Sequence, residues 1–395
     1  MRKLSAHYLY LGNGNILEKG VVTCDDDGRI VDIQDTNGSL KESSNVEFYS
    51  GILIPGMVNT HCHLELSDTK GVIPQHTTLP DFIRHVISIE RAPLENRVQR
   101  AKVFDRVMFN EGVSVVGDIS NGSDSFEVKK ESQIKYHTFV EALGSSESVA
   151  KAAFQNVKEV LCKAHTMGLS ASIVPHAPYS VSSSLMKMID QHCEDSIISI
   201  HNQESSSENE LFLTGTGAMA KHLSEVIGLD MSRFNVIHKS SIHSYLDKIA
   251  TSHPLLLVHN TFMRQDDIEL VRSVRGWDRT FLALCPKSNL YIENQLPDLS
   301  LFLSQNIPLT IGTDSLASNT SLSMIEEMKV LQDNCDELSL NDIVEMATLN
   351  GAKALQLDHQ YGSIEVGKSP GIVLLKDVDL KKCKLTANSR SERII

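Results

Sequence analysis

The chain has 395 residues, of which 41% are hydrophobic and 22% are charged, a composition typical of a globular protein with a sizeable core. It contains 37 Lys and Arg residues and 50 Asp and Glu residues, so its formal net charge is −13. A field of that sign repels phosphate backbones, which argues against a nucleic-acid partner.

Neither a membrane span nor a secretion signal is predicted. No stretch approaches the roughly 18 consecutive apolar residues of a membrane-spanning helix. The basic start Met1-Arg2-Lys3 is not followed by an apolar segment. Seven cysteines without paired spacing fit reduced thiols better than a disulfide framework. These features predict a cytoplasmic protein without a membrane partner, and a homodimer is compatible with them.

The first fifty residues predict a small β module. Residues 8–11 and 20–24 are rich in strand-forming side chains and are separated by turn-forming glycine and asparagine. The sequence Asp25-Asp26-Asp27-Gly28 is typical of a hairpin turn and precedes another apolar stretch at residues 29–33. We therefore expect short strands joined by tight turns up to residue 50.

A different pattern begins near residue 51. Short runs rich in Val, Ile and Leu recur, and each is followed by a polar loop and a segment of helical periodicity. The eight runs are residues 52–58, 113–119, 134–143, 169–174, 197–200, 255–258, 281–284 and 309–311. Eight buried strands that alternate with helices predict an α/β fold, a (β/α)8 barrel similar to a TIM barrel. An open doubly wound sheet is disfavoured because no G-x-G-x-x-G motif follows any run.

Beyond Gly351 the pattern returns to short strands, at residues 362–368 and 372–375. We expect both ends of the chain to build one small β-sandwich module beside the barrel. The predicted boundaries are residues 1–50 plus 356–395 for the β module and residues 51–355 for the catalytic barrel.

Polar residues that suit metal binding follow five of the eight runs. They are His61 and His63, His176, His201 with Glu204, His259, and Asp314. Alternate residues of a strand point to the same side, so His61 and His63 can share one ion, whereas Cys62 between them is expected in the core. A single histidine at a strand end is more often structural. A whole ring of imidazoles around a carboxylate is better explained by a bound ion, because it is otherwise costly to desolvate.

These motifs, in this order, resemble the amidohydrolase superfamily. The resemblance rests on residues 55–63 (PGMVNTHCH), 176–179 (HAPY), 201–204 (HNQE), His259, 285–289 (CPKSN), 312–314 (GTD) and 362–368. It covers nearly the whole chain. The similar branch is the one that contains S-adenosylhomocysteine, guanine and cytosine deaminases and triazine chlorohydrolases.

The resemblance implies one divalent metal ion and a role for each site residue. The four ligands would be His61, His63, His201 and Asp314. Asp314 would also accept a proton from the reactive water, which His259 would hold by a hydrogen bond. Glu204 would carry protons to the substrate, and His176 would contact it. Relatives with two metals have a lysine where this chain has His176, so a mononuclear site is expected. The ligand types favour zinc, and iron is also accepted by such sites.

The function that the resemblance implies is hydrolytic deamination of an amino-substituted purine or pyrimidine-like ring or of a nucleoside derivative. Residues 63–67 (HLELS), 82–83 and 201–205 are similar to 6-amino-6-deoxyfutalosine deaminases, which makes that nucleoside a candidate substrate. An alternative is a chlorohydrolase or ring amidohydrolase that uses the same mononuclear site. A non-catalytic scaffold is disfavoured, because such proteins typically lose ligands and this chain has all of them.

Three further residues are predicted substrate contacts. Glu65 stands where many deaminases of the similar branch have a small or apolar residue. Residues 79–91 predict a helix with Pro80 in its first turn, on which Arg84 and Arg91 would share one face. We expect one of the two, Arg91 in preference, to bind a substrate carboxylate remote from the reacting ring. The alternative is that both arginines are solvated surface residues.

Overall fold

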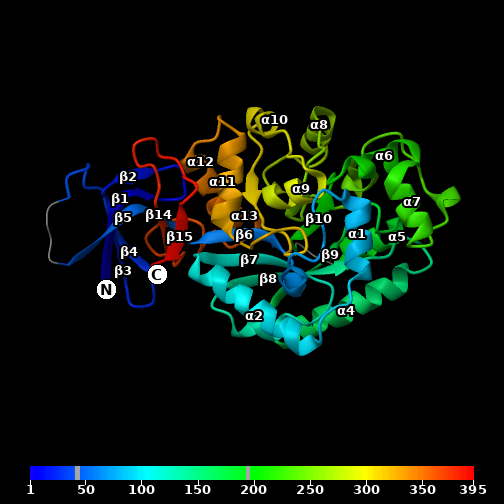
Figure 1. The fold of residues 1–395 in the computed structure, drawn as a ribbon, viewed down its shortest axis with the longest axis horizontal. Helices are drawn as coiled ribbons and strands as arrows, with labels where there is room; N and C mark the ends of the chain where they lie inside the picture. Colours follow the sequence, from blue (N-terminus) through cyan, green and yellow to red (C-terminus); the bar gives the residue numbers. More distant parts are fainter. Residues whose placement is uncertain (41–44, 193–195) are drawn as a thin grey trace.

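The computed structural model describes residues 1–40, 45–192 and 196–395. Figure 1 shows a small sheet at one end of the molecule, where both termini lie, and a larger part in which strands alternate with helices. No helix in the described ranges has the length and apolar character that crossing a membrane requires. The six cysteines in these ranges are free thiols, as predicted, whereas Cys193 lies outside them.

The small sheet combines strands from both ends of the chain, as the sequence predicts. Its strands are β1 (Arg2–Tyr10), β2 (Ile16–Glu18), β3 (Val21–Cys24), β4 (Ile30–Gln34), β5 (Val46–Pro55), β14 (Ile372–Lys376) and β15 (Arg390–Arg393). Their order is β15-β14-β5-β1-β3-β4, with β2 paired to β1. The predicted hairpin turn joins β3 to β4, where Gly28 has φ +79° and Asp25 Oδ1 accepts a hydrogen bond from Arg29 N at 2.8 Å.

The predicted first barrel strand, residues 52–58, is wrong in its boundaries. Residues 52–55 belong to β5 and pair with β1 and β14, whereas a separate strand, β6 (Met57–Cys62), enters the larger part. Gly56 joins the two strands. A Cβ at this position would lie 2.0 Å from Ser114 Oγ and 2.3 Å from the Pro370 carbonyl oxygen, so only glycine fits. The apolar run continues across a change of sheet, which composition alone does not reveal.

The predicted strand at residues 362–368 is also wrong, because these residues form turns. They nevertheless bind to the small sheet through the backbone. Ile364 N donates to Leu11 O at 2.9 Å, and Gly367 N donates to Ile30 O at 2.9 Å. The segment therefore closes the chain onto the β module without extending a strand.

Eight strands of the larger part form two parallel sheets of four. One contains β6, β7 (Val113–Ser120), β8 (Lys135–Ala142) and β9 (Ser170–Pro175), and the other contains β10 (Ile198–Asn202), β11 (Leu255–His259), β12 (Thr280–Leu284) and β13 (Leu309–Ile311), each in chain order. Every residue of β6, β7, β10, β11, β12 and β13 is buried. Strands buried on both faces explain why the sequence shows continuous apolar runs.

The two parallel sheets meet at both edges without a continuous ladder. At one edge His201 N donates to His176 O at 2.9 Å. At the other, Thr313 N and Asp314 N donate to His61 O at 3.0 Å, and Cys62 forms a single parallel bridge with Asp314. A closed eight-stranded ladder is therefore not formed among the described strands. These contacts nevertheless bring the predicted site residues together.

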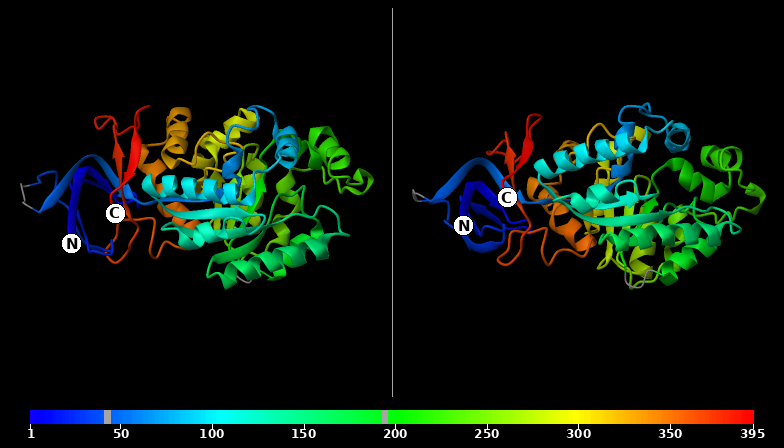
Figure 2. Two further views of the ribbon diagram at one scale, coloured as in Figure 1. Left: turned by 60° about the horizontal axis from the view of Figure 1, so that its bottom comes forward. Right: turned by 90° about the horizontal axis from the view of Figure 1, so that it is seen from below.

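Helices flank the strands of the larger part (Figure 2). They are α1 (Leu79–Ser88), α2 (Leu94–Asn110), α3 (Phe126–Glu131), α4 (Ala150–Thr166), α5 (Ser183–His192), α6 (Ser206–Thr214), α7 (Gly217–Glu225), α8 (Gln265–Val274), α9 (Pro286–Glu293), α10 (Leu299–Ser304), α11 (Met324–Asn334), α12 (Leu340–Ala347) and α13 (Leu349–Ala354), with short 3-10 helices η1 (Leu64–Thr69), η2 (Met231–Arg233), η3 (Ser241–Ser244) and η4 (Leu246–Lys248). Helix α4 packs on β8 and β9, and α13 packs on β6 and β13.

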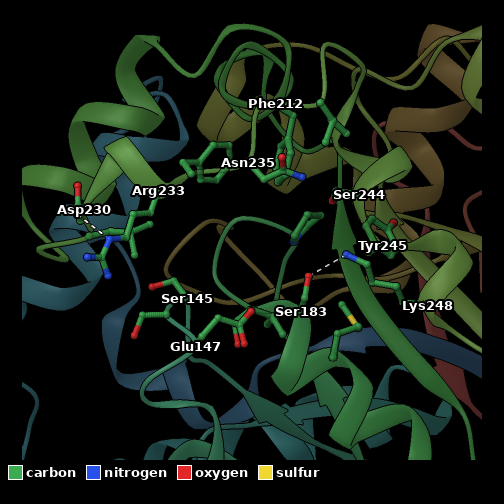
Figure 3. Close-up of a pocket in the computed structure, with 18 of the residues that line it drawn as sticks. Ser145, Glu147, Ser183, Phe212, Asp230, Arg233, Asn235, Ser244, Tyr245 and Lys248 are labelled. Carbon is green, nitrogen blue, oxygen red and sulfur yellow. Dashed lines mark hydrogen bonds and ion pairs between the residues drawn. The ribbon is translucent and has the colours of Figure 1, made fainter.

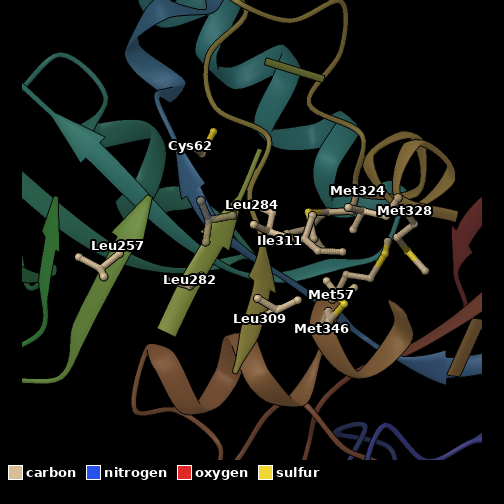
Figure 4. Close-up of a cluster of buried hydrophobic side chains, with 14 of the residues drawn as sticks. Met57, Cys62, Leu257, Leu282, Leu284, Leu309, Ile311, Met324, Met328 and Met346 are labelled. Atoms are coloured by element: carbon tan, nitrogen blue, oxygen red, sulfur yellow. The ribbon is translucent and has the colours of Figure 1, made fainter. Parts of the chain in front are cut away.

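The hydrophobic core of the larger part lies on both faces of the strands. Leu282 and Leu284 belong to the cluster drawn in Figure 4, together with methionines from α11 and α12. Their neighbours Phe281 and Ala283 point to the opposite face and join a separate cluster. Cys62 is buried in the first of these clusters, as its place between two inward-pointing histidines predicts.

Candidate active site

The residues that the sequence places at strand ends gather at one end of the parallel strands. His61 lies next to the last residue of β6, His201 lies in β10, and His259 ends β11. His176 directly follows β9, and Asp314 lies three residues beyond β13. The rings of His61, His63, His201 and His259 pack against one another with centroids between 4.9 and 5.8 Å apart. The carboxyl ends of parallel strands meet at one edge, which is where sites of such folds are built.

Three ligand atoms converge at the end of β6. His61 Nε2 lies 3.2 Å from His63 Nε2, and Asp314 Oδ1 lies 3.6 Å from the first and 3.4 Å from the second. His201 also belongs to this cluster, since one ring nitrogen of each of the three histidines lies within 4.8 Å of the others. The alternation of side chains along β6 brings His61 and His63 together, as the spacing predicts.

The surroundings make the imidazoles neutral and the carboxylate charged. Burial lowers the pKa of His63 to about 4, and it also lowers the pKa of His61 and of His201. Burial opposes ionisation of Asp314, but its contacts with His61 and the neighbouring rings hold the pKa of this carboxyl well below its usual value. Neutral imidazole and ionised carboxylate are the forms that bind metal ions.

This donor set fits a divalent metal ion. Ligand atoms in a tetrahedral zinc site lie about 2.0–2.2 Å from the ion, which separates neighbouring ligands by about 3.3–3.6 Å. The distances among His61, His63 and Asp314 match that spacing. Without an ion, the two buried Nε2 atoms would face each other with one shared proton at most. The convergence of unprotonated nitrogens and a carboxylate is therefore best explained by a cation.

His201 and Asp314 are also oriented by contacts on the side of each residue that faces away from the cluster. His201 Nδ1 lies 2.7 Å from the His176 carbonyl oxygen, which directs its other ring nitrogen toward the cluster. Asp314 Oδ2 accepts hydrogen bonds from Ser288 Oγ and Ser318 Oγ, both at 2.6 Å, which leaves Oδ1 facing the histidines. Such outer partners fix the orientation of metal ligands.

Glu204 and His259 lie beside this cluster. Glu204 Oε1 is 3.7 Å from His259 Nε2, and His259 Nδ1 is 3.0 Å from Asn289 Oδ1. Burial raises the pKa of Glu204 well above its usual value, which favours the protonated carboxyl. His259 and Asp314 have positive φ angles of 71° and 56°. Such backbone strain in non-glycine residues is concentrated at functional sites.

Glu65 belongs to a network of two acidic side chains that the sequence reveals only in part. Asn121 Nδ2 donates to Glu65 Oε1 at 3.3 Å and to Glu141 Oε2 at 3.1 Å, and Glu141 Oε1 lies 3.6 Å from His201 Nδ1. Burial raises the pKa of Glu65 to about 7 and that of Glu141 to about 8. Glu141 was not among the predicted site residues. The sequence feature that could have identified it is an acidic residue near the end of the apolar run 134–143.

The predicted helix 79–91 ends early, so Arg84 and Arg91 do not share a helical face. Helix α1 ends at Ser88 and Ile89 is extended. Arg84 is half-exposed and pairs with Asp81 at 3.2 Å. Arg91 forms a two-point contact with Asp68, at 2.7 and 3.2 Å, and donates to the Glu65 carbonyl oxygen at 2.6 Å. Arg91 thus holds the η1 turn that carries Glu65.

A large cavity lies beside this site and does not include it. It has a volume of about 810 Å³ and is lined by residues after β8 and β9 and by the segment between α7 and β11, including Glu147, Arg233 and Lys248 (Figure 3). Pro178 lines it, two residues beyond His176. None of the predicted metal-binding or catalytic residues is among its walls.

Comparisons with known proteins show a family and several relatives to which this chain is similar. A profile of the amidohydrolase family matches residues 52–395. The chain is 30% identical over 355 residues to an adenosine deaminase of Helicobacter pylori, covering 87% of this chain and 84% of that protein. It is 28% identical over 338 residues to an aminodeoxyfutalosine deaminase of Nitratiruptor, covering 82% and 79%.

A similar solved structure is that of Helicobacter pylori aminofutalosine deaminase in complex with methylthio-coformycin. Its TM-score is 0.83 at 25% sequence identity, and the alignment covers 100% of both chains. Sequence and structure thus lead to the same group of relatives.

Proposed function

Since the chain belongs to the amidohydrolase family and is a hydrolase acting on carbon–nitrogen bonds, we propose that it deaminates an amino-substituted purine or pyrimidine-like ring within a nucleoside derivative. The first candidate substrate is 6-amino-6-deoxyfutalosine. The names of the Nitratiruptor relative and of the similar Helicobacter structure support that choice. The observation that carries the proposal is the convergence of His61, His63 and Asp314 beside Glu204, a buried acid whose pKa is raised by that burial.

We further propose that the two parallel sheets act as one (β/α)8 barrel. The hydrogen bonds from His201 to His176 and from Asp314 to His61 support this, because they join the two sheets at both edges. The predicted division, residues 51–355 for the catalytic barrel and residues 1–50 with 356–395 for the β module, is proposed with its first boundary moved to the change of sheet at Gly56, because residues 52–55 pair within the small sheet. For the β module we retain the sandwich as a proposal.

For the metal site we propose a single divalent ion. Its ligands are His61, His63, His201 and Asp314. The donor set of three imidazoles and one carboxylate suits zinc, and iron is the other candidate. When bound, the ion supplies a Lewis acid that makes water nucleophilic near neutral pH.

Side chains of this protein accept and donate the protons that the reaction transfers. Water adds to the ring carbon that bears the amino group, and Asp314 Oδ1 accepts a proton from it. Glu204 gives its proton to the adjacent ring nitrogen, which its raised pKa allows. His259 Nδ1 donates to Asn289 Oδ1, so its Nε2 is free to accept a hydrogen bond that orients the attacking oxygen. The amino group then takes the proton held by Asp314 and leaves as ammonia as the carbon–nitrogen bond breaks. The added hydroxyl passes its remaining proton to Glu204 as the carbonyl forms, which restores both carboxyls.

Substrate contacts are proposed for His176, Glu65, Arg91 and Arg84. His176 faces His201 with ring centroids 4.8 Å apart, so it lies next to the reacting ring. Glu65 and the arginine that holds its turn, Arg91, lie on the β6 side of the site. Arg91 is the candidate for a substrate carboxylate, and Arg84 is the second candidate.

The cellular setting remains as the sequence predicts it. We propose a cytoplasmic enzyme with a small-molecule substrate, and the net charge of −13 speaks against nucleic acid as a partner. A homodimer is the assembly to test first.

Ammonia release from a panel of aminated heterocycles tests the proposal. The panel should contain 6-amino-6-deoxyfutalosine, adenosine and S-adenosylhomocysteine, each beside its 6-chloro analogue. Ammonia from at least one nucleoside, with slower turnover of the chloro analogue, is the expected result. Chloride release without ammonia would identify a chlorohydrolase and overturn the proposal.

A further inference from the structure

A buried ion pair lies behind the His61 and His63 segment and has no part in the proposed chemistry. Asp118 on β7 and Lys129 on α3 both have fully buried side chains, and Lys129 Nζ lies 2.6 Å from Asp118 Oδ2. Removing two charges from water is expensive, and hydrophobic residues of similar volume are often as stabilising as such a pair. A contribution to stability therefore does not account for these two residues.

The other oxygen of Asp118 binds the backbone next to a proposed metal ligand. Asp118 Oδ1 accepts a hydrogen bond from Leu64 N at 2.8 Å, and Leu64 follows His63. The β6–β7 ladder ends where Cys62 pairs with Asp118. Beyond that pair, the Asp118 side chain takes the place of the β7 backbone and accepts the hydrogen bond from Leu64 N. Asp118 thus fixes the chain at the point where β6 turns into η1.

Lys129 in turn fixes Asp118. Its ammonium group lies within hydrogen-bond distance of three acceptors: Asp118 Oδ2, Ser120 Oγ at 2.8 Å and Thr138 Oγ1 at 3.2 Å. The two hydroxyl oxygens accept hydrogen bonds from the ammonium group, and Asp118 Oδ2 forms an ion pair with it. The rings of Phe126 and Tyr136 lie 5.5 and 5.9 Å from Nζ. A cation enclosed in this way holds the Asp118 carboxylate in one orientation.

We propose that Asp118 and Lys129 are positioning residues for the metal ligand His63. The hydrogen bond to Leu64 N sets the backbone that carries His63, and thereby the placement of its Nε2 against His61 and Asp314. The same bond sets the start of η1, which carries Glu65. This inference rests on the proposed metal site.

Two double variants isolate the hydrogen bond from the charges. Asp118→Asn/Lys129→Met removes both charges and keeps an oxygen acceptor for Leu64 N. Asp118→Leu/Lys129→Met removes both charges and the acceptor. Asp190→Leu is the matched control, because Asp190 Oδ1 also accepts from a backbone nitrogen, that of Ala250, at 2.7 Å on a different loop. Zinc affinity is measured by competition with a chelator, and site geometry by the visible spectrum of the Co²⁺-loaded proteins.

The leucine variant should bind zinc about 10- to 100-fold more weakly than the unmodified protein, as outer partners of metal ligands do when removed, and its Co²⁺ spectrum should change. The asparagine variant and Asp190→Leu should stay within about threefold, the size of ordinary variation in such measurements. Equal affinities in both double variants, whether high or low, would overturn the role of the hydrogen bond.

Two further outcomes are distinguishable. If the unmodified protein binds no zinc, the metal site itself fails, and the inference fails with it. If leucine is not accommodated, Asp118→Ala/Lys129→Met makes the same comparison. Failure of both apolar variants to fold, while the asparagine variant folds, would assign the bond to folding as a whole and overturn a role specific to His63.

Discussion

Glu204 Oε1 lies 3.7 Å from His259 Nε2, with both side chains buried beside Asp314. Burial, and to a smaller extent the nearby carboxylate of Asp314, raises the pKa of Glu204. The surroundings therefore shift the pKa values of Glu204 and Asp314 in opposite directions. Two acids whose surroundings push their pKa values apart are suited to be proton donor and proton acceptor in one reaction.

Replacing Glu204 tests the proton donor directly. Glu204→Gln keeps the size of the side chain and removes the transferable proton, so turnover should fall by about 10²-fold or more while bound metal is unchanged. Steady-state kinetics and elemental analysis of the same preparation measure both. Glu210→Gln, at an exposed position of α6, is the control and should keep normal turnover. Near-normal activity of Glu204→Gln would move the proton donor elsewhere.

Metal content tests the proposed ligands. The purified protein should contain about one divalent ion per chain, and His61→Ala and Asp314→Ala should each lose most of it, because each removes one of four ligands. Elemental analysis after dialysis gives the stoichiometry. Cys62→Ala is the control, since its side chain lies in the hydrophobic core between the two ligands. Full metal content in both ligand variants would show that the ion is held elsewhere.

The proposed ligands could be predicted from the sequence because each follows a recognisable apolar run. The positioning residues could not. Asp118 and Lys129 lie in separate elements, and their contact depends on how α3 packs against β7 and β8. Glu141 is recognised as part of the site by its contacts with Asn121 and His201, which join separate elements. The extent of helix α1 was wrong because apolar periodicity continues through Ile89, although the backbone is already extended there.

The change of sheet at Gly56 was hidden for a similar reason. Both β5 and β6 are buried where they meet, so their apolar residues merge into one run. What separates them is the close approach of Ser114 and Pro370 to Gly56. Such a contact is made by residues far apart in sequence and leaves no local pattern.

A matched pair of substrates tests the arginines, one with a free carboxylate and one with that group esterified. Arg91→Met should reduce the preference for the acid by about tenfold, the effect of losing one charge-assisted contact. Comparing acid with ester in each variant cancels any general effect of disturbing the Asp68 contact on η1. Arg84→Met is assayed in parallel. An unchanged preference in both variants would show that neither arginine binds the substrate carboxylate.

Acid sensitivity should depend on His137, a buried histidine on β8 away from the site. Its ring nitrogens lie 2.9 and 3.0 Å from Ser170 Oγ and Ser172 Oγ, and burial lowers its pKa from 6.5 to about 4. Between these two values the unfolded chain binds a proton that the folded chain does not. The stabilising effect of the neutral ring is therefore complete above about pH 6.5 and is lost as the pH falls toward 4.

The expected loss is on the order of 3 kcal/mol, since each pKa unit corresponds to about 1.4 kcal/mol. His137→Gln cannot take up this proton in either state. The variant should be less stable than the unmodified protein at pH 7.5, because glutamine fits the two serines less well, and the difference should shrink as the pH approaches 4. Urea unfolding of both proteins across this pH range measures the difference in their free energies of unfolding. All other titrating groups are the same in the two proteins, so the pH dependence of that difference reports on His137. A stability difference that stays constant from pH 7.5 to 4.5 would mean that His137 takes up its proton equally in the folded and unfolded states.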